Sequence, residues 1–358
     1  MVFKCSGFWV GVLKETRNAT PQHPNTPHPN TRIPVITGEL HGGTNIGRRS
    51  PVGTVHAFRS SSASLMHRLL PLVCVSVLLT ACSSITIGEQ DVLYPKPSVT
   101  PQTFDQEGVT LTDTSVAVTD SVAVNAWHLT QPEATATVLF FGGNGFYLVQ
   151  STGYLRALTR PPANALLWDY RGYGRSEGTP GVEELKHDAL AVYDSLRARS
   201  GVSADRLVVW GHSLGSFLAT HVAVEREVAG VVLENPATNV DDWVGHLIPW
   251  YVRLFLGVNV DPALKGESNL KRVRSMETPL LVVAGAEDNV TNPEMARRLH
   301  AAAAPTDKEL IVVEEGSHNG LYDDPAVQDA YRELVETVGE SGMPADTASV
   351  KGPRGERP

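Results

Sequence analysis

Residues 207–216 constrain the fold of this chain more than any other stretch, because they join an apolar run to a tight turn flanked by glycines. The sequence reads Leu-Val-Val-Trp-Gly-His-Ser-Leu-Gly-Ser. Its Gly-x-Ser-x-Gly frame sets Ser213 between Gly211 and Gly215, as in a nucleophile elbow. Strand and helix come so close in such a turn that both flanking positions require glycine. The stretch therefore predicts a strand, a strained turn that exposes Ser213, and a helix.

Two later apolar runs end in residues that could activate this serine. A serine hydroxyl is a weak nucleophile at neutral pH and needs a general base, which an acid group orients. The run at 279–284 leads to Asp288, and the run at 309–313 leads to His318 in a glycine-flanked loop. Elbow serines are followed along the chain by the acid and then by the histidine. We expect Asp288 to orient His318, and His318 to take the proton of Ser213.

Other side chains are alternatives for both roles. Glu287 adjoins Asp288 as a second acid, and Asp288 also lies near a helix start at residues 292–294, where it could act in capping. Four other histidines are available as bases: His212, His221, His246 and His300. Unlike these four, His318 both follows the acid along the chain and lies at the end of a predicted strand. His212 is predicted to point away from the site and to serve in packing.

Backbone amides are expected to complete the site. The carbonyl oxygen of a reacting substrate gains negative charge and requires preorganised N–H donors. The amide of Leu214, directly after the nucleophile, is the first predicted donor. The second is expected from the Gly-Gly-Asn-Gly sequence that follows the apolar run at 136–141, with Asn144 as the donor. An ordinary glycine-rich turn is the alternative interpretation of that loop.

These motifs together resemble those of the α/β-hydrolase superfamily. The resemblance covers roughly residues 109–338 and includes residues 169–178, Asp-Tyr-Arg-Gly-Tyr-Gly-Arg-Ser-Glu-Gly. This segment is similar to the Asp-x-Arg-Gly-x-Gly-x-Ser sequence of serine hydrolases in the esterase and serine aminopeptidase-like branch. Its glycines do not have the spacing of a dinucleotide-binding loop. One departure is Gly142, which stands where many relatives carry histidine.

The resemblance implies a serine hydrolase that cleaves carboxylic esters or thioesters through an acyl-enzyme, with no cofactor and no metal ion. Its partner would be a small-molecule or lipid-like ester. Two alternatives stay open on the sequence. One is amide hydrolysis of the aminopeptidase type, and the other is a catalytically silent, membrane-anchored binding protein with the same fold.

Alternating strand-like and helix-like runs predict one α/β domain at about residues 106–340, with a mostly parallel central sheet and helices on both faces. The first strands, around 116–124 and 126–129, are expected to form an antiparallel edge. Residues 236–275 are predicted to form a small helical cap. Six of its apolar residues recur at helical spacing, and they either shape an acyl pocket, dip into lipid, or hold the cap down: Trp243, Leu247, Trp250, Tyr251, Leu254 and Phe255.

The N-terminal part resembles a bacterial lipoprotein signal peptide at residues 66–81. Met-His-Arg precedes the apolar run 69–79, which is too short to span a bilayer comfortably, and Leu-Thr-Ala-Cys follows. The resemblance implies cleavage before Cys82, which would carry the lipid anchor of a cell-envelope protein on the periplasmic face, in the inner or the outer membrane. A hydrophobic helix with an incidental cysteine is the alternative.

The remaining segments are predicted to lie outside the catalytic domain. Because secretory signals lie at the N-terminus, translation is expected to start at Met66. Residues 1–65 are then a non-native or disordered extension, which the Pro, Thr and Asn content of residues 21–34 supports. Residues 82–105 are predicted to form a tether and 341–358 a disordered tail.

Charge and cysteine content narrow the class of protein further. The formal net charge is −9, and it falls to −15 without residues 1–81, which carry eight basic and two acidic residues. A surface this acidic repels nucleic acid. Cys82 would be the one cysteine left after cleavage, so no intramolecular disulfide could form. The sequence does not indicate an oligomeric state.

Overall fold

The computed structural model describes residues 2–5, 8–11, 84–96, 99–253 and 257–341. The chain divides into two compact units, residues 1–80 and 81–358. In the first unit, β1 (Val2–Cys5) pairs antiparallel with β2 (Phe8–Gly11). The predicted signal peptide, Cys82 and the C-terminal tail after α11 lie outside the described residues. No helix in the described ranges is long and apolar enough to cross a membrane.

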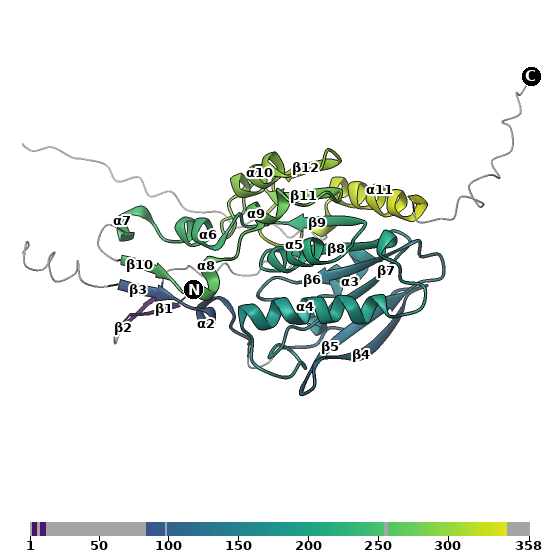
Figure 1. Cartoon of the computed structure of the whole chain (residues 1–358), viewed down its shortest axis with the longest axis horizontal. Coiled ribbons are helices and arrows are strands. Elements are labelled where there is room, and N and C mark those ends of the chain that lie inside the picture. Colours follow the sequence, from purple (N-terminus) through teal and green to yellow (C-terminus); the bar gives the residue numbers. More distant parts are fainter. Residues whose placement is uncertain (1, 6–7, 12–83, 97–98, 254–256, 342–358) are drawn as a thin grey trace, which may run out of the picture. The chain divides into compact units, whose positions relative to one another are not determined.

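An eight-stranded sheet forms the centre of the second unit (Figure 1). Its strand order is β12-β11-β9-β8-β6-β7-β5-β4. The strands are β4 (Thr110–Thr119), β5 (Val122–Thr130), β6 (Ala136–Phe141), β7 (Ala163–Trp168), β8 (Leu207–His212), β9 (Gly230–Glu234), β11 (Leu280–Gly285) and β12 (Lys308–Val313). Neighbouring strands from β7 to β12 pair in parallel, whereas β5 is antiparallel to both β4 and β7. The predicted mostly parallel sheet and its antiparallel edge are confirmed.

The boundary of the first hairpin differs from the prediction. The expected strand at 116–124 runs through the turn at Asp120 and Ser121, where β4 ends and β5 begins. Alternation of apolar and polar residues continues on both sides of this turn, because Val116, Val118 and Val124 are all buried. Periodicity alone therefore did not show where the chain reverses.

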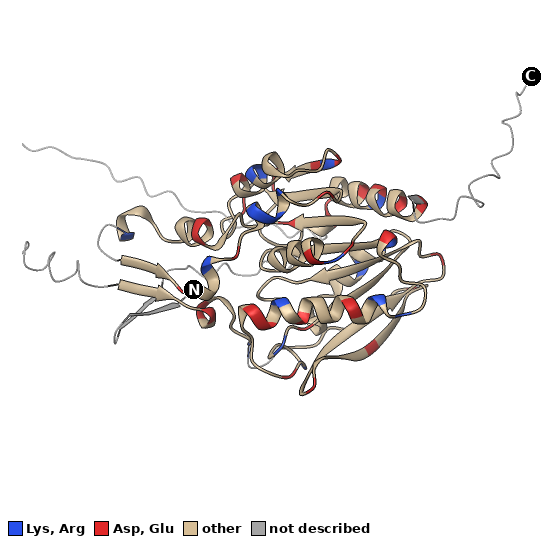
Figure 2. Ribbon diagram, in the orientation of Figure 1, with Lys and Arg blue, Asp and Glu red and all other residues tan. Residues whose placement is uncertain are grey.

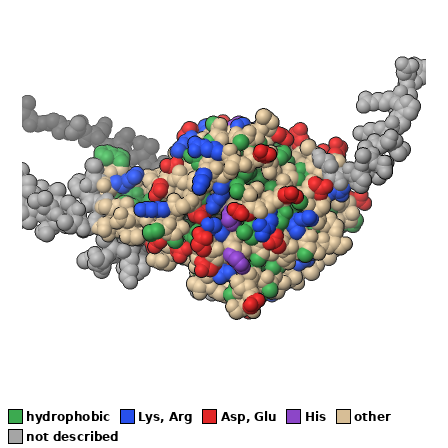
Figure 3. Space-filling model, viewed as in Figure 1, with side chains coloured by type: hydrophobic (Ala, Val, Ile, Leu, Met, Phe, Trp, Pro, Cys, Tyr) green, Lys and Arg blue, Asp and Glu red, His purple; other side chains and the backbone are tan. Residues whose placement is uncertain are grey.

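Helices cover both faces of the sheet, as predicted. One layer contains α4 (Val182–Arg197), α5 (Gly215–Glu225) and α10 (Pro293–Ala302); the other contains α3 (Thr152–Leu158) and α11 (Pro325–Ser341). Single turns of 3-10 helix occur at Leu148–Gln150, Ala204–Arg206 and Leu321–Asp323. The core-facing residues of α4 recur at helical spacing, since Leu185, Ala189, Val192 and Leu196 are buried. Figure 2 shows acidic residues along α11 and basic residues on α9, and side chains of both signs intermingle on the face in Figure 3.

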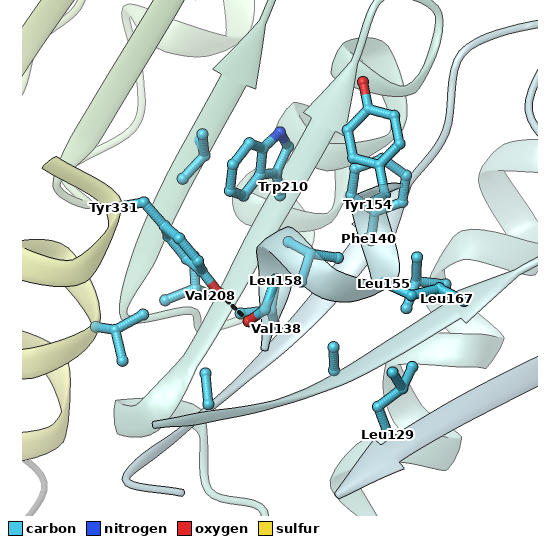
Figure 4. Packing of buried hydrophobic residues seen from close by; sticks show 14 of the residues in the cluster. Leu129, Val138, Phe140, Tyr154, Leu155, Leu158, Leu167, Val208, Trp210 and Tyr331 are labelled. Atoms are coloured by element: carbon cyan, nitrogen blue, oxygen red, sulfur yellow. Dashed lines mark hydrogen bonds between the residues drawn. The ribbon is translucent and has the colours of Figure 1, made fainter. Parts of the chain in front are cut away.

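The core between the sheet and the α3–α11 layer combines aliphatic side chains with several aromatic rings (Figure 4). Trp210 of β8 meets Tyr331 of α11 edge to face, with ring centroids 4.9 Å apart. The Tyr331 hydroxyl donates to the Leu158 carbonyl at 2.8 Å, so its polar end has a partner inside the core. This packing makes β8, which carries the elbow at its end, a rigid platform.

The insertion between β9 and β11 contains four short helices and a strand. These are α6 (Val240–Leu247), α7 (Trp250–Arg253), β10 (Gly257–Val260), α8 (Pro262–Lys265) and α9 (Asn269–Val273). Pro249 separates α6 from α7, and residues 254–256 lie outside the described residues. Trp250 is 73% exposed and Tyr251 56%, so neither is a core contact that holds the cap down.

The segment predicted as a tether is packed against the domain for much of its length. It contains β3 (Ser84–Ile87), which pairs in parallel with β10, and α2 (Glu89–Val92). Ile87, Val92 and Leu93 are buried, and the Glu89 carboxylate accepts the Val182 amide at the start of α4. This segment therefore differs from a free linker, because its short apolar runs are buried.

Candidate active site

The carboxyl ends of three parallel strands, which meet at the same edge of the sheet, bring the three predicted catalytic side chains together. Ser213 follows β8, Asp288 follows β11 and His318 follows β12. The Ser213 Oγ lies 2.9 Å from the Nε2 of His318, and the Nδ1 of His318 lies 2.7 Å from the Oδ2 of Asp288. Both distances are those of good hydrogen bonds. A continuous chain therefore joins the serine hydroxyl to a carboxylate, the geometry that lets an imidazole accept the serine proton.

The elbow has the strained backbone that its glycines predict. Ser213 has a φ of 52°, in the left-handed region that side chains rarely adopt. A Cβ on Gly211 would lie 2.5 Å from the Gly215 carbonyl oxygen, and one on Gly215 would lie 2.0 Å from that of Phe141. The strand and the helix are therefore in contact at both positions, and neither has room for a side chain.

Burial distinguishes Asp288 from the alternative acid. Asp288 is buried, while Glu287 is exposed. The Asp288 Oδ1 accepts the amides of Val290 and Thr291 at 2.7 and 3.0 Å, and the Thr291 hydroxyl lies 2.7 Å from its Oδ2. Burial would raise the pKa of Asp288, but the bonds from His318 and Thr291 hold it below its usual value overall. The acid is therefore a carboxylate at neutral pH, as orientation of an imidazole requires.

The other candidate bases do not face the serine. His246 is exposed on α6, His221 is half-buried on α5, and the Nε2 of His300 lies 3.5 Å from the Lys308 carbonyl oxygen. None of the three forms a hydrogen bond with Ser213 among the contacts of the described residues.

His212 does not point away from the site, contrary to the prediction. Its Nε2 lies 2.9 Å from the main-chain carbonyl oxygen of His318, and the two rings are 5.2 Å apart. A carbonyl only accepts, so this nitrogen carries the proton. Burial, with the neighbouring His318, lowers the pKa of His212 to about 3, and the ring is neutral. His212 thus supports the loop that carries His318.

The glycine-rich loop after β6 lies directly beside the nucleophile. A Cβ on Gly143 would be 3.4 Å from that of Ser213. A Cβ on Gly142 would be 2.2 Å from the Phe146 ring, so this ring fills the space next to the position where relatives carry histidine. Leu214 is the residue that precedes the first residue of α5, so its amide belongs to the positive end of that helix. The predicted donors, Leu214 and Asn144, thus lie on the two segments that flank Ser213.

Two tyrosine hydroxyls hold this loop from the segment after β7. Tyr170 donates to the Gly142 carbonyl oxygen and Tyr173 to the Asn144 Oδ1, both at 2.6 Å. Burial raises the pKa of both tyrosines, so both hydroxyls remain protonated donors. The segment is in turn fixed by Arg171, which pairs with the buried Asp188 of α4. The motif at 169–178 therefore positions the loop after β6.

Several residues of this site were not found from the sequence. Tyr170 and Tyr173 stand at variable positions of the 169–178 motif, and their contacts are with the distant loop after β6. Thr291 contacts Asp288 three residues away but belongs to no motif. Asn235 offered a signal, as an asparagine directly after a buried strand and suited to left-handed backbone. Within the described ranges, no group of three or more His, Cys, Asp and Glu side chains could hold a metal ion.

The fold and the site define an α/β-hydrolase. A family model described as "Serine aminopeptidase, S33" matches residues 132–264 and 260–325, and the chain belongs to this family.

The chain is similar to proteins from several organisms. An uncharacterized protein of Mycobacterium tuberculosis, MT2364, is 31% identical over 76% of this chain and 96% of its own length. The lysophosphatidylserine lipase ABHD12 of Macaca fascicularis is 34% identical over 40% of this chain and 38% of its own length. Among solved structures, the esterase Pf2001 of Pyrococcus furiosus aligns with a TM-score of 0.53 at 18% identity, over 69% of this chain and 97% of that one. This last likeness concerns the fold.

Proposed function

We propose that this protein is a serine hydrolase that cleaves carboxylic ester or thioester bonds through an acyl-enzyme. The observation that carries the proposal is the unbroken hydrogen-bond chain from Ser213 through His318 to the buried Asp288. An activated serine, a general base and an orienting carboxylate are the parts that acyl transfer requires.

Each step follows from that geometry. His318 takes the proton as the Ser213 Oγ forms a bond to the substrate carbonyl carbon, and the oxygen becomes an oxyanion. The amides of Leu214 and Asn144 donate to this oxygen. Collapse of the intermediate breaks the bond to the leaving alkoxide or thiolate, which receives the proton from His318. Water, deprotonated by His318, then attacks the acyl-enzyme and releases the acid, with Ser213 regaining its proton.

The test compares two substrate classes on one preparation. Short p-nitrophenyl esters and aminoacyl p-nitroanilides report ester and amide cleavage with the same chromophore. We expect turnover of the esters, and its loss in Ser213→Ala. Faster release from the anilides would instead favour amide hydrolysis, the alternative suggested by the description of the family model. A folded protein that cleaves neither would favour a binding protein with this fold.

We propose further that the substrate is lipid-like and that Cys82 carries a lipid anchor in the cell envelope. The likeness to a protein named a lysophosphatidylserine lipase supports an acyl substrate. β3 begins two residues after Cys82 and pairs with β10 of the cap, near α7 with its exposed Trp250 and Tyr251. Two residues span about 7 Å at most, so an anchor there would hold the cap close to a bilayer. Trp and Tyr suit the membrane interface because their rings are amphipathic.

Two measurements separate these statements. Mass spectrometry of the protein from a bacterial host tests the anchor, since a lipidated Cys82 changes the mass of the N-terminal peptide and Cys82→Ser abolishes the change. Trp250→Ala tests whether the cap contacts the acyl chain of the substrate. A changed preference between acetyl and octanoyl esters supports contact with the acyl chain, whereas unchanged selectivity with lower stability contradicts it.

A further inference from the structure

A second strained residue lies beside the nucleophile. In the described part of the chain, the non-glycine residues with positive φ are Ser213 at 52° and Asn235 at 46°. They directly follow β8 and β9, which are neighbours in the sheet. The strain at Ser213 belongs to the elbow, but the elbow does not explain the strain at Asn235. A backbone held in a sparsely populated conformation costs energy and persists where its surroundings require it.

The side chain of Asn235 joins the two loops that carry the acid and the base. Its Oδ1 accepts the amide of Gly285, at the end of the strand leading to Asp288, at 2.9 Å. Its Nδ2 donates to the carbonyl oxygens of Ser317 and His318 at 3.1 and 2.9 Å. Asn235 is 2% exposed, and its side chain accepts a bond from the strand end that leads to the acid and donates bonds to the loop that carries the base. Asparagine is suited to this because its amide has both groups and its backbone tolerates the left-handed region.

The backbone around Asn235 reaches the remaining parts of the site. The Thr291 hydroxyl, which also contacts Asp288, lies 3.0 Å from the carbonyl oxygen of Asn235. The preceding residue, Glu234, accepts the amide of Ser213 through its own carbonyl oxygen at 2.9 Å. The segment 234–235 therefore contacts the nucleophile elbow, the acid loop and the base loop at once.

From these contacts we infer that Asn235 is a positioning residue that sets the distance between His318 and Ser213. The inference rests on the proposed function of the triad. The carbonyl oxygen of His318 receives two donors, from Asn235 and from the neutral ring of His212. Two fixed donors to this main-chain oxygen hold the backbone of His318 in place, and so fix the position from which its imidazole extends toward Ser213. Loss of one donor frees the loop, and a displacement of 1 Å at a reacting pair costs about 10²-fold in rate.

Asn235→Asp tests this with a minimal change of shape. Aspartate also tolerates the left-handed region and keeps an oxygen for the Gly285 amide, but it presents an acceptor to the two carbonyls. Asn235→Gly is the second variant, because glycine adopts this φ without strain while losing every side-chain bond. Gln131→Glu is the matched control, since the Gln131 Nε2 likewise donates to main-chain carbonyl oxygens, those of Pro161 and Ala163, but at the start of β7 and so at the opposite end of the sheet from these loops.

The readout is the rate and the end point of labelling with a fluorophosphonate, with kcat and KM for an ester measured on the same full-length samples. We expect both Asn235 variants to label to the wild-type end point about 10²-fold more slowly, with kcat reduced alike and KM within twofold. Gln131→Glu should label at the wild-type rate.

Two outcomes overturn the inference. One is labelling of both Asn235 variants at the wild-type rate, and the other is a lower end point with an unchanged rate per labelled site, which is the result of a purely structural role. A folded wild type that neither labels nor turns over esters would contradict the proposed function itself, and is thereby distinguished from both.

Discussion

Glu234 is a fully buried carboxyl group next to the elbow, and its ionisation should control stability at alkaline pH. Its two oxygens accept from the Trp210 indole at 3.1 Å and from the Tyr154 hydroxyl at 3.2 Å. Burial raises the pKa of Glu234 to about 8, and the two hydrogen bonds offset this only in part. The group is therefore protonated in the folded protein at neutral pH.

The sign of the effect follows from proton binding in the two states. The usual glutamate pKa is 4.5, so above that pH the unfolded chain releases a proton that the folded protein keeps. Stability then decreases as the pH rises from 4.5 to about 8, and levels off above it. At 1.36 kcal/mol per pKa unit, the loss is about 3 kcal/mol at pH 7 and about 5 kcal/mol at pH 9.

Glu234→Gln removes the ionisation while keeping the shape of the group. The amide oxygen can accept from Trp210, and the amide nitrogen can donate to the Tyr154 oxygen in place of the bond that Tyr154 donates to Glu234. We expect the variant to match the wild type near pH 5 and to be more stable by an amount that grows to several kcal/mol at pH 9. Urea unfolding at pH 5, 7 and 9 measures this difference.

The comparison at each pH cancels every group that the two proteins share. Glu336→Gln, an exposed change on α11, controls for the removal of one carboxylate. If the free energy of unfolding of Glu234→Gln differs from that of the wild type by the same amount from pH 5 to 9, the ionisation of Glu234 does not control stability at alkaline pH.

Three further predictions concern the site. Asp288→Asn should lower kcat by about 10³- to 10⁴-fold, because the amide favours the wrong imidazole tautomer; steady-state kinetics with an unchanged circular dichroism spectrum checks this. Tyr173→Phe removes the bond to the Asn144 side chain and should lower kcat about tenfold with KM unchanged. If kcat and KM change by the same factor, the result counts against a role in the oxyanion loop. Gly215→Ala should destabilise the fold by about 1–3 kcal/mol in denaturant unfolding, because its Cβ would lie 2.0 Å from the Phe141 oxygen.

Local patterns predicted the parts of the molecule that neighbouring residues determine. The limits predicted for β6 were those observed, and Gly211, Ser213 and Gly215 identified the elbow before any contact was known. These succeed because a buried strand and a tight turn each impose their requirement on consecutive residues.

Features that depend on distant contacts could not be predicted in the same way. His212 was misplaced because its neighbours in sequence do not reveal that the His318 loop passes over it. Asn235 joins residues about 50 and 80 positions away, and only the strand order places them together. The packed β3 was missed because its partner β10 lies some 170 residues further along the chain.

The central claim is that Ser213 is a nucleophile activated by His318, and mapping a fluorophosphonate adduct tests it most directly. We expect one adduct per full-length chain, located by peptide mass spectrometry on Ser213, absent in Ser213→Ala and formed far more slowly in His318→Ala. A folded wild type that stays unlabelled, or an adduct that persists in Ser213→Ala, would contradict it.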